Sequence, residues 1–342
     1  MSVSEEITKY KMVPKQVRKG LRYYLLVLIL IAWGIAFLLT ASIALTRLSP
    51  VAFLGAAILL YFGLVLRNVY RALNPVRTPV LSNPLTQIEA GYEDVVFTSR
   101  DGWPLSGWFI PTRKGPTVIL THGWGGNRLD LMPAASLLIE DGFGVLMYDM
   151  RCHGRSTGSL GTWGWLEIND LHGAVDYLLE RSDVIQHQIG AFGFSLGGQV
   201  TLRAAAENPI IRAVIVEDPS PAVLADHPYP EEFSWRKWIN FPGLWLVYRL
   251  QKAVSGVQEP RGILSTIGEI APRPLLLITS GDGRAAELVH TFFDQAGEPK
   301  DFWQVPEAGH GWISIKRTQE YQGRLCDFFQ HYLIGDEIIE YT

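Results

Sequence analysis

Hydrophobic residues dominate two stretches near the start of the chain. Residues 23–45 are almost uninterruptedly apolar, and a second apolar run covers residues 51–66. A helix of roughly 20 apolar residues is long enough to cross the hydrocarbon core of a bilayer. Because Arg47 and Pro50 separate the two runs, the pattern predicts a two-helix transmembrane hairpin over residues 23–70.

Basic residues flank this hairpin on both sides, and only Arg47 lies between its two runs. Those before and after it are Lys9, Lys11, Lys15, Arg18, Lys19, Arg22, Arg67, Arg71 and Arg77. Lys and Arg are enriched on the cytoplasmic flanks of membrane helices. We therefore predict an integral protein of the cell membrane, with residues 1–22 and the part of the chain after the hairpin in the cytoplasm. The alternative is a cleavable signal peptide, whose apolar region would be shorter, about 7–15 residues, and would end in a cleavage site.

The remainder of the chain alternates between β-rich and helical runs. A proline-containing segment, residues 71–87, is predicted to be a linker. Strands are expected at 94–98, 105–110, 117–121, 144–149, 189–194, 211–217, 274–279 and 302–305. Helices are expected at 131–140, 166–179, 196–207 and 285–295 and after Trp312. This alternation predicts one large α/β domain, residues 88–342, with a mostly parallel sheet and helices on both faces.

One insertion interrupts this pattern. Residues 219–265 contain several prolines and an aromatic-rich stretch around Trp235, Trp238 and Trp245. Such an excursion over the ligand-binding edge of a sheet is predicted to form a lid or cap. Its aromatic residues either pack onto the domain or contact the surface of the bilayer, where Trp and Tyr are enriched.

Composition excludes several classes of function. The net charge is −4, and basic residues form no patch beyond the hairpin flanks, so the sequence does not support nucleic-acid binding. Cys152 and Cys326 form no disulfide framework or metal-ligand spacing. The glycine loop that begins at Gly123 resembles a dinucleotide fingerprint, but Arg128 stands where the third glycine belongs. We therefore expect no cofactor and no metal.

The most informative motif is Gly193-Phe194-Ser195-Leu196-Gly197-Gly198. It lies between a predicted strand and a predicted helix. Glycines two positions before and after Ser195 leave room for a sharp turn that raises the serine into a strained backbone conformation. Ser195 is therefore a candidate nucleophile.

A serine hydroxyl needs a base to take its proton and an acid to orient that base. His310 follows the last predicted strand, 302–305, and has a glycine on each side. Asp282 lies in the turn that follows the preceding predicted strand, 274–279. Because ligands bind at the carboxyl ends of strands in such sheets, Ser195, Asp282 and His310 are predicted to meet as a catalytic triad. Three other carboxylates remain alternatives for the acid: Asp218, Asp301 and Glu307.

The tetrahedral intermediate of acyl transfer needs two preset backbone donors for its oxyanion. Leu196 provides one N–H at the start of its helix, where the helix dipole favours negative charge. The loop that begins at His122 is predicted to provide the other through the N–H of Trp124, whose indole would also line an acyl pocket. His122 is predicted to stabilise the turn.

From about residue 88 to the end, the chain resembles the α/β-hydrolase superfamily. The resemblance includes the approach Val95–Pro111 and the loop Tyr148-Asp149-Met150-Arg151-Cys152-His153-Gly154-Arg155-Ser156, in which Cys152 replaces the usual glycine. The chain looks like the branch that includes membrane-associated single-domain hydrolases and acyl-protein thioesterase relatives. The resemblance implies hydrolysis through an acyl-enzyme, and a serine nucleophile argues against dehalogenases and epoxide hydrolases.

Together these features predict a membrane-anchored serine hydrolase that cleaves carboxylic esters or thioesters. Its substrate would be a small-molecule or lipid-like acyl ester. Two alternatives remain: a peptidase or amidase of the same fold, and a non-catalytic membrane-tethered binding module.

Overall fold

The computed structural model describes residues 31–36, 50–81, 91–113, 115–227 and 235–335. The chain divides into two compact units. The larger unit contains Pro75–Tyr229 and the chain from Glu259 onward. The smaller unit combines Met12–Asn74 with Pro230–Gln258, so it is built from two segments that are far apart in the sequence.

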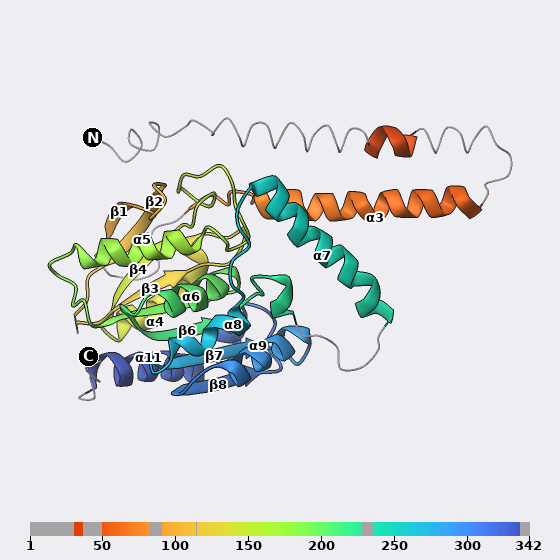
Figure 1. Cartoon of the computed structure of the whole chain (residues 1–342). Helices are drawn as coiled ribbons and strands as arrows, with labels where there is room; N and C mark the ends of the chain where they lie inside the picture. Colours follow the sequence, from red (N-terminus) through yellow and green to blue (C-terminus); the bar gives the residue numbers. More distant parts are fainter. Residues whose placement is uncertain (1–30, 37–49, 82–90, 114, 228–234, 336–342) are drawn as a thin grey trace. The chain divides into compact units, whose positions relative to one another are not determined.

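A single mixed sheet forms the centre of the larger unit (Figure 1). Its strand order is β1-β2-β4-β3-β5-β6-β7-β8. β2 pairs antiparallel with β1 and β4, and the other neighbours pair parallel. The strands are β1 (Glu93–Thr98), β2 (Pro104–Ile110), β3 (Thr117–Thr121), β4 (Gly144–Tyr148), β5 (Ile189–Phe194), β6 (Ile211–Glu217), β7 (Leu275–Ser280) and β8 (Lys300–Val305). The sheet confirms the eight strands that the sequence predicts.

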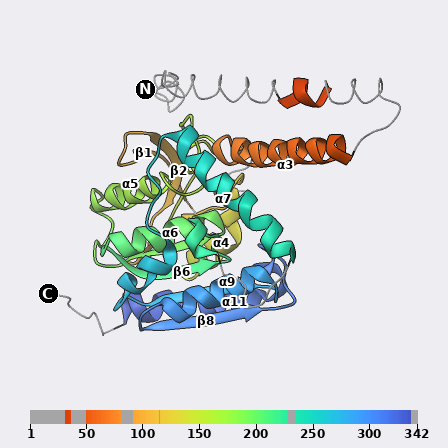
Figure 2. The same ribbon diagram turned by 45° about the vertical axis from the view of Figure 1, so that its right-hand side comes forward.

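Helices cover both faces of this sheet (Figures 1 and 2). Alternate strand residues point to opposite faces, so Leu146 belongs to one core cluster and its neighbour Met147 to the other. The first face is covered by α5 (Ile168–Leu179), α6 (Leu196–Glu207), α8 (Ile263–Thr266), η4 (Ile267–Ile270) and α9 (Arg284–Gln295). The second is covered by α4 (Met132–Glu140) and α11 (Thr318–Ile334).

Three short helices lie in the connections of the same unit. They are η2 (Arg128–Leu131), η3 (Leu224–Asp226) and α10 (Ile313–Lys316).

In the part of the smaller unit that the structure describes, two long helices pack against each other, α3 (Pro50–Leu73) and α7 (Trp235–Ser255). Gly243 permits their close approach, because a Cβ at this position would lie 2.6 Å from the Tyr61 hydroxyl oxygen. The predicted cap insertion therefore contains a long helix, and that helix packs on the apolar helix α3.

Among the described residues, α3 is the one helix that is long and apolar enough to cross a membrane. The stretch that meets this criterion is Ala52–Leu73, which has 22 residues. A helix of this kind fits a membrane anchor and also a signal sequence. The structure thus shows one apolar helix where the sequence predicts a hairpin of two. The first predicted span, 23–45, lies outside the described residues except for 31–36, which are helical. The basic segment 1–22 and residues 82–87 of the predicted linker lie outside them too.

Candidate active site

Ser195 occupies the sharp turn that the glycine motif predicts. β5 ends at Phe194, α6 begins at Leu196, and Ser195 between them has φ 54° and ψ −115°. A left-handed φ at a non-glycine residue costs of order 1–3 kcal/mol and persists where the surrounding structure enforces it. Here the packing is tight, since a Cβ at Gly197 would lie 2.0 Å from the carbonyl oxygen of Thr121.

His310 lies between the Ser195 hydroxyl and a carboxylate. Its Nε2 is 3.0 Å from Ser195 Oγ. Its Nδ1 is 3.1 Å from Oδ2 of Asp218, which directly follows β6. The structure therefore joins a hydroxyl, an imidazole and a carboxylate in one chain of hydrogen bonds at the carboxyl ends of β5, β6 and β8.

Asp218 is buried and accepts several further hydrogen bonds. Its Oδ1 accepts from the Ser280 N–H at 2.7 Å and from Thr279 Oγ1 at 3.2 Å, and its Oδ2 accepts from Ser280 Oγ at 2.6 Å. Burial raises the pKa of Asp218, but the hydrogen bonds from His310 and Ser280 outweigh it, so the pKa lies below its usual range. The same bond to Asp218 raises the pKa of His310 above its usual range, against the opposite effect of partial burial.

The structure does not bring Asp282 to His310, so the prediction of Asp282 as the orienting acid is wrong in geometry. β7 ends at Ser280, and Asp282 stands exposed two residues beyond it, without a hydrogen bond or ion pair among the described residues. Asp218 comes directly after a strand that neighbours β5, which places it next to the serine turn. The other two alternatives pair elsewhere: Asp301 with Arg324, and Glu307 with Arg317.

The loop after β3 lies against Ser195, as the sequence predicts. A Cβ at Gly123 would be 3.3 Å from the Cβ of Ser195. His122 Nε2 accepts the Met150 N–H at 3.0 Å, so the ring proton is on Nδ1, which donates to the Gly123 carbonyl at 2.7 Å. Burial and the neighbouring His153 lower the pKa of His122 to about 3, so it stays neutral and stabilises this turn.

The two predicted oxyanion donors are the backbone N–H groups of Trp124, in the loop after β3, and of Leu196, directly after Ser195. The Trp124 N–H belongs to the same peptide unit as the Gly123 carbonyl that His122 holds, and it has no hydrogen-bond partner among the described residues. The Leu196 N–H is the first of α6, so no intrahelical acceptor is available to it.

Two pairs of aromatic rings lie near the Ser195 turn. The Trp124 and Trp163 rings lie 5.7 Å apart, and the Phe194 ring lies 4.8 Å from that of His310. Trp163 escaped prediction because it comes from the loop after β4 and meets Trp124 only through the fold. Gln199 holds it by donating to its carbonyl oxygen at 3.2 Å.

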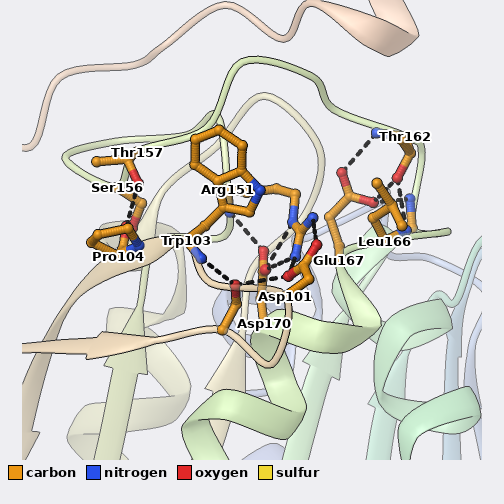
Figure 3. Close-up of polar contacts among 12 residues, drawn as sticks. Asp101, Trp103, Pro104, Arg151, Ser156, Thr157, Thr162, Leu166, Glu167 and Asp170 are labelled. Atoms are coloured by element: carbon orange, nitrogen blue, oxygen red, sulfur yellow. Dashed lines mark hydrogen bonds and ion pairs between the residues drawn. The ribbon is translucent and has the colours of Figure 1, made fainter. Parts of the chain in front are cut away.

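A buried ion-pair network fixes the loop after β4 (Figure 3). Arg151 donates to Asp170 Oδ1 and to Asp101 Oδ1, both at 2.6 Å. Glu167 accepts from the N–H and hydroxyl of Thr162 at 2.8 and 2.7 Å. Glu167 also accepts the Gly164 N–H at 2.8 Å, so it holds the segment on both sides of Trp163.

Cys152, where the resembling family has glycine, has φ 64°. Its backbone thus takes the left-handed conformation that glycine favours, with the bulkier residue in place. Burial raises the pKa of its thiol to about 12, so the thiol is protonated at neutral pH. Cys152 and Cys326 are both free and buried. Among the described residues, no three His, Cys, Asp or Glu side chains are grouped in a way that could hold a metal ion.

Comparison with known proteins gives consistent matches. A model of the α/β-hydrolase fold matches residues 116–267. The uncharacterized protein YfhR of Escherichia coli (strain K12) is 31% identical over 249 residues, which cover 69% of this chain and 80% of the relative.

Solved structures are similar too. The Pyrococcus furiosus esterase Pf2001 is 27% identical, with a TM-score of 0.61 over 76% of this chain and 100% of the esterase. Est1E of Butyrivibrio proteoclasticus, solved with ferulic acid bound, is 18% identical, with a TM-score of 0.54 over 70% of this chain and 100% of its own. This second likeness shows the fold alone.

Proposed function

Because the chain belongs to the α/β-hydrolase superfamily, we propose that it is a serine hydrolase that cleaves carboxylic esters or thioesters. The observation that carries the proposal is His310, whose Nε2 lies 3.0 Å from Ser195 Oγ and whose Nδ1 lies 3.1 Å from Asp218. We assign Ser195 as nucleophile, His310 as base and acid, and Asp218 as the residue that orients the imidazole.

In the acylation step, Ser195 Oγ attacks the substrate carbonyl carbon while its proton moves to Nε2 of His310. The ionised Asp218 holds the other ring proton on Nδ1 and stabilises the imidazolium that forms. When the tetrahedral intermediate collapses, His310 gives its proton to the leaving alcohol or thiol, and an acyl ester remains on Ser195. Water, deprotonated by His310, then attacks this ester. As the second tetrahedral intermediate collapses, His310 returns the proton to Ser195 Oγ and the carboxylic acid is released.

The oxyanion of each tetrahedral intermediate would lie between the N–H groups of Leu196 and Trp124. Leu196 directly follows Ser195, and a Cβ at Gly123, which precedes Trp124, would lie 3.3 Å from the Cβ of Ser195. The α6 dipole adds favourable electrostatic potential at Leu196. Removal of one such donor typically lowers kcat by about 10²–10³-fold. The Trp124 and Trp163 rings, whose centroids lie 5.7 Å apart, offer an apolar wall for the acyl chain.

Two further observations support the finer parts of the proposal. Similarity to the Pyrococcus furiosus esterase favours ester hydrolysis. α3 has the length and apolarity of a transmembrane anchor, and Arg67 and Arg71 in its last turns favour a cytoplasmic hydrolase unit. An enzyme anchored in this way would meet lipid-like acyl esters at high local concentration.

Activity-based labelling of the full chain in detergent micelles tests the proposal. A fluorophosphonate probe should label the wild type and S265A, which removes an exposed serine of α8, but not S195A. Equal labelling of the wild type and S195A would contradict the proposed nucleophile. Matched p-nitrophenyl esters and p-nitroanilides should then show faster turnover of the esters, and a preference for the anilides would favour a peptidase or amidase.

A further inference from the structure

The segment that follows the apolar helix is in contact with the proposed active site. Residues 75–81, here called the tether segment, form neither helix nor strand and belong to the larger unit. Val80 is buried in the core cluster that contains α4, whereas Val76 and Leu81 are exposed. The segment therefore has one fixed point in the core next to the loops that surround Ser195.

Thr78 binds the glycine loop after β3. Its hydroxyl donates to the carbonyl oxygen of Gly125 at 2.6 Å. In return, Asn127 Nδ2 donates to the Thr78 carbonyl at 3.2 Å. The tether segment and the glycine loop are thus joined by hydrogen bonds in both directions.

Arg77 binds the neighbouring loop after β4. Its guanidinium donates to the carbonyl oxygen of Ser156 and, at 3.0 Å, to that of Gly158. This second loop also reaches the glycine loop, because His153 Nε2 accepts the Gly125 N–H at 3.1 Å. Gly125 is therefore held from both sides, by His153 at its N–H and by Thr78 at its carbonyl.

These bonds matter because of the conformation of the loop. Gly125 has φ 74°, and glycine samples many backbone conformations when nothing restrains it. The Trp124 N–H lies one peptide unit before the Gly125 N–H. The direction of this proposed oxyanion donor is thus fixed by His122 on one side and by the two bonds at Gly125 on the other.

We propose that Thr78 is a positioning residue that holds the oxyanion donor Trp124 in place through the Gly125 carbonyl. The tether segment would then help to position the catalytic site, in addition to connecting α3 to the larger unit. This inference rests on the proposed hydrolase function. The substrate contacts neither Thr78 nor Arg77 in this scheme, so loss of the hydroxyl would reduce transition-state stabilisation and leave ground-state binding largely intact.

The test compares three variants of the full chain in detergent. T78V removes the hydroxyl at nearly constant volume, and T78S keeps it. T291V is the matched control, because Thr291 makes the same kind of bond, hydroxyl to Glu287 carbonyl at 2.9 Å, on the surface of α9. Since a whole oxyanion donor contributes about 10²–10³-fold, T78V should lower kcat by about 5–30-fold with KM within about twofold. T78S and T291V should stay near the wild type.

A second readout needs no substrate. Hydrogen–deuterium exchange in the peptide covering residues 122–127 should be faster in T78V than in the wild type, T78S and T291V. Unchanged exchange in T78V would overturn the positioning role, whether or not the protein proves to be a hydrolase. An unchanged kcat in T78V, in an enzyme whose activity depends on Ser195, would overturn it and leave the proposed function standing. If T78S fails as badly as T78V, the hydroxyl is not what positions the loop.

Discussion

Replacement of Asp218 by asparagine is the sharpest test of the assignment of the acid. The new side chain would keep an acceptor toward the Ser280 N–H, but it would present an amide N–H group where Oδ2 now accepts from His310 Nδ1. Two donors cannot bond each other. The imidazole would therefore favour the tautomer with its proton on Nε2, which cannot accept the proton of Ser195.

The expected loss follows from this change of tautomer. In a triad of this geometry, an Asp-to-Asn change costs about 10⁴-fold in kcat, which corresponds to roughly 5.5 kcal/mol of transition-state stabilisation. The acid side of the pH profile should change as well. Asp218 raises the pKa of His310, and catalysis needs the neutral imidazole, so wild-type activity increases as the pH rises through a value above 6.5. Without the carboxylate, that pKa falls and the residual activity should reach its plateau at lower pH.

The measurement is kcat for a p-nitrophenyl ester between about pH 5 and 9 for the wild type, D218N and D282N. D282N is the matched control, since Asp282 is exposed and lies outside the hydrogen-bond chain. Activity of D218N within tenfold of the wild type would refute the reasoning. A loss in D282N as large as that in D218N would restore the acid that the sequence predicts.

Three further changes test the structure around the site. G123A would place a Cβ 3.3 Å from that of Ser195, so kcat should fall by about tenfold, with an unchanged melting temperature as the control. R151M leaves buried carboxylate charge without its partner and should lower the free energy of unfolding in urea by about 3–5 kcal/mol, whereas R100M breaks an exposed pair and should cost about 1 kcal/mol or less. Burial raises the pKa of Glu217 from 4.5 to about 7, so the wild type should lose stability as the pH rises through that range. E217Q should be more stable than the wild type by roughly 3 kcal/mol at pH 9, and equal stability of the two at that pH would contradict the shift.

Local signals in the sequence predict much of the fold and part of the site. The eight strands are predictable from short apolar runs between turn residues. The Ser195 turn is predictable from Gly193 and Gly197, where a Cβ would collide with nearby backbone atoms. His310 is predictable because glycines flank it in the loop that follows the last strand. Each of these features depends mainly on residues close to it in the sequence.

The choice between Asp218 and Asp282 could not be made in this way. Both follow parallel strands of the same sheet edge, and the sequence does not show which side chain turns toward the histidine. The difference lies in a tertiary detail: Asp218 has φ 48° immediately after β6, and Ser280 of β7 donates to its carboxylate. The contacts of Thr78 and Trp163 likewise arise between segments that the sequence separates.

The pairing of α3 with α7 has a practical consequence for preparing the protein. A common route to a soluble sample is to delete everything up to the end of the first apolar helix. Here that deletion would keep α7 while removing the helix it rests on, and the surface at Gly243 that now accommodates Tyr61 would be left bare. A shortened version suited to crystallisation should therefore begin at about Pro75 and also replace residues 230–258 with a short connector, so that both halves of the smaller unit are removed together.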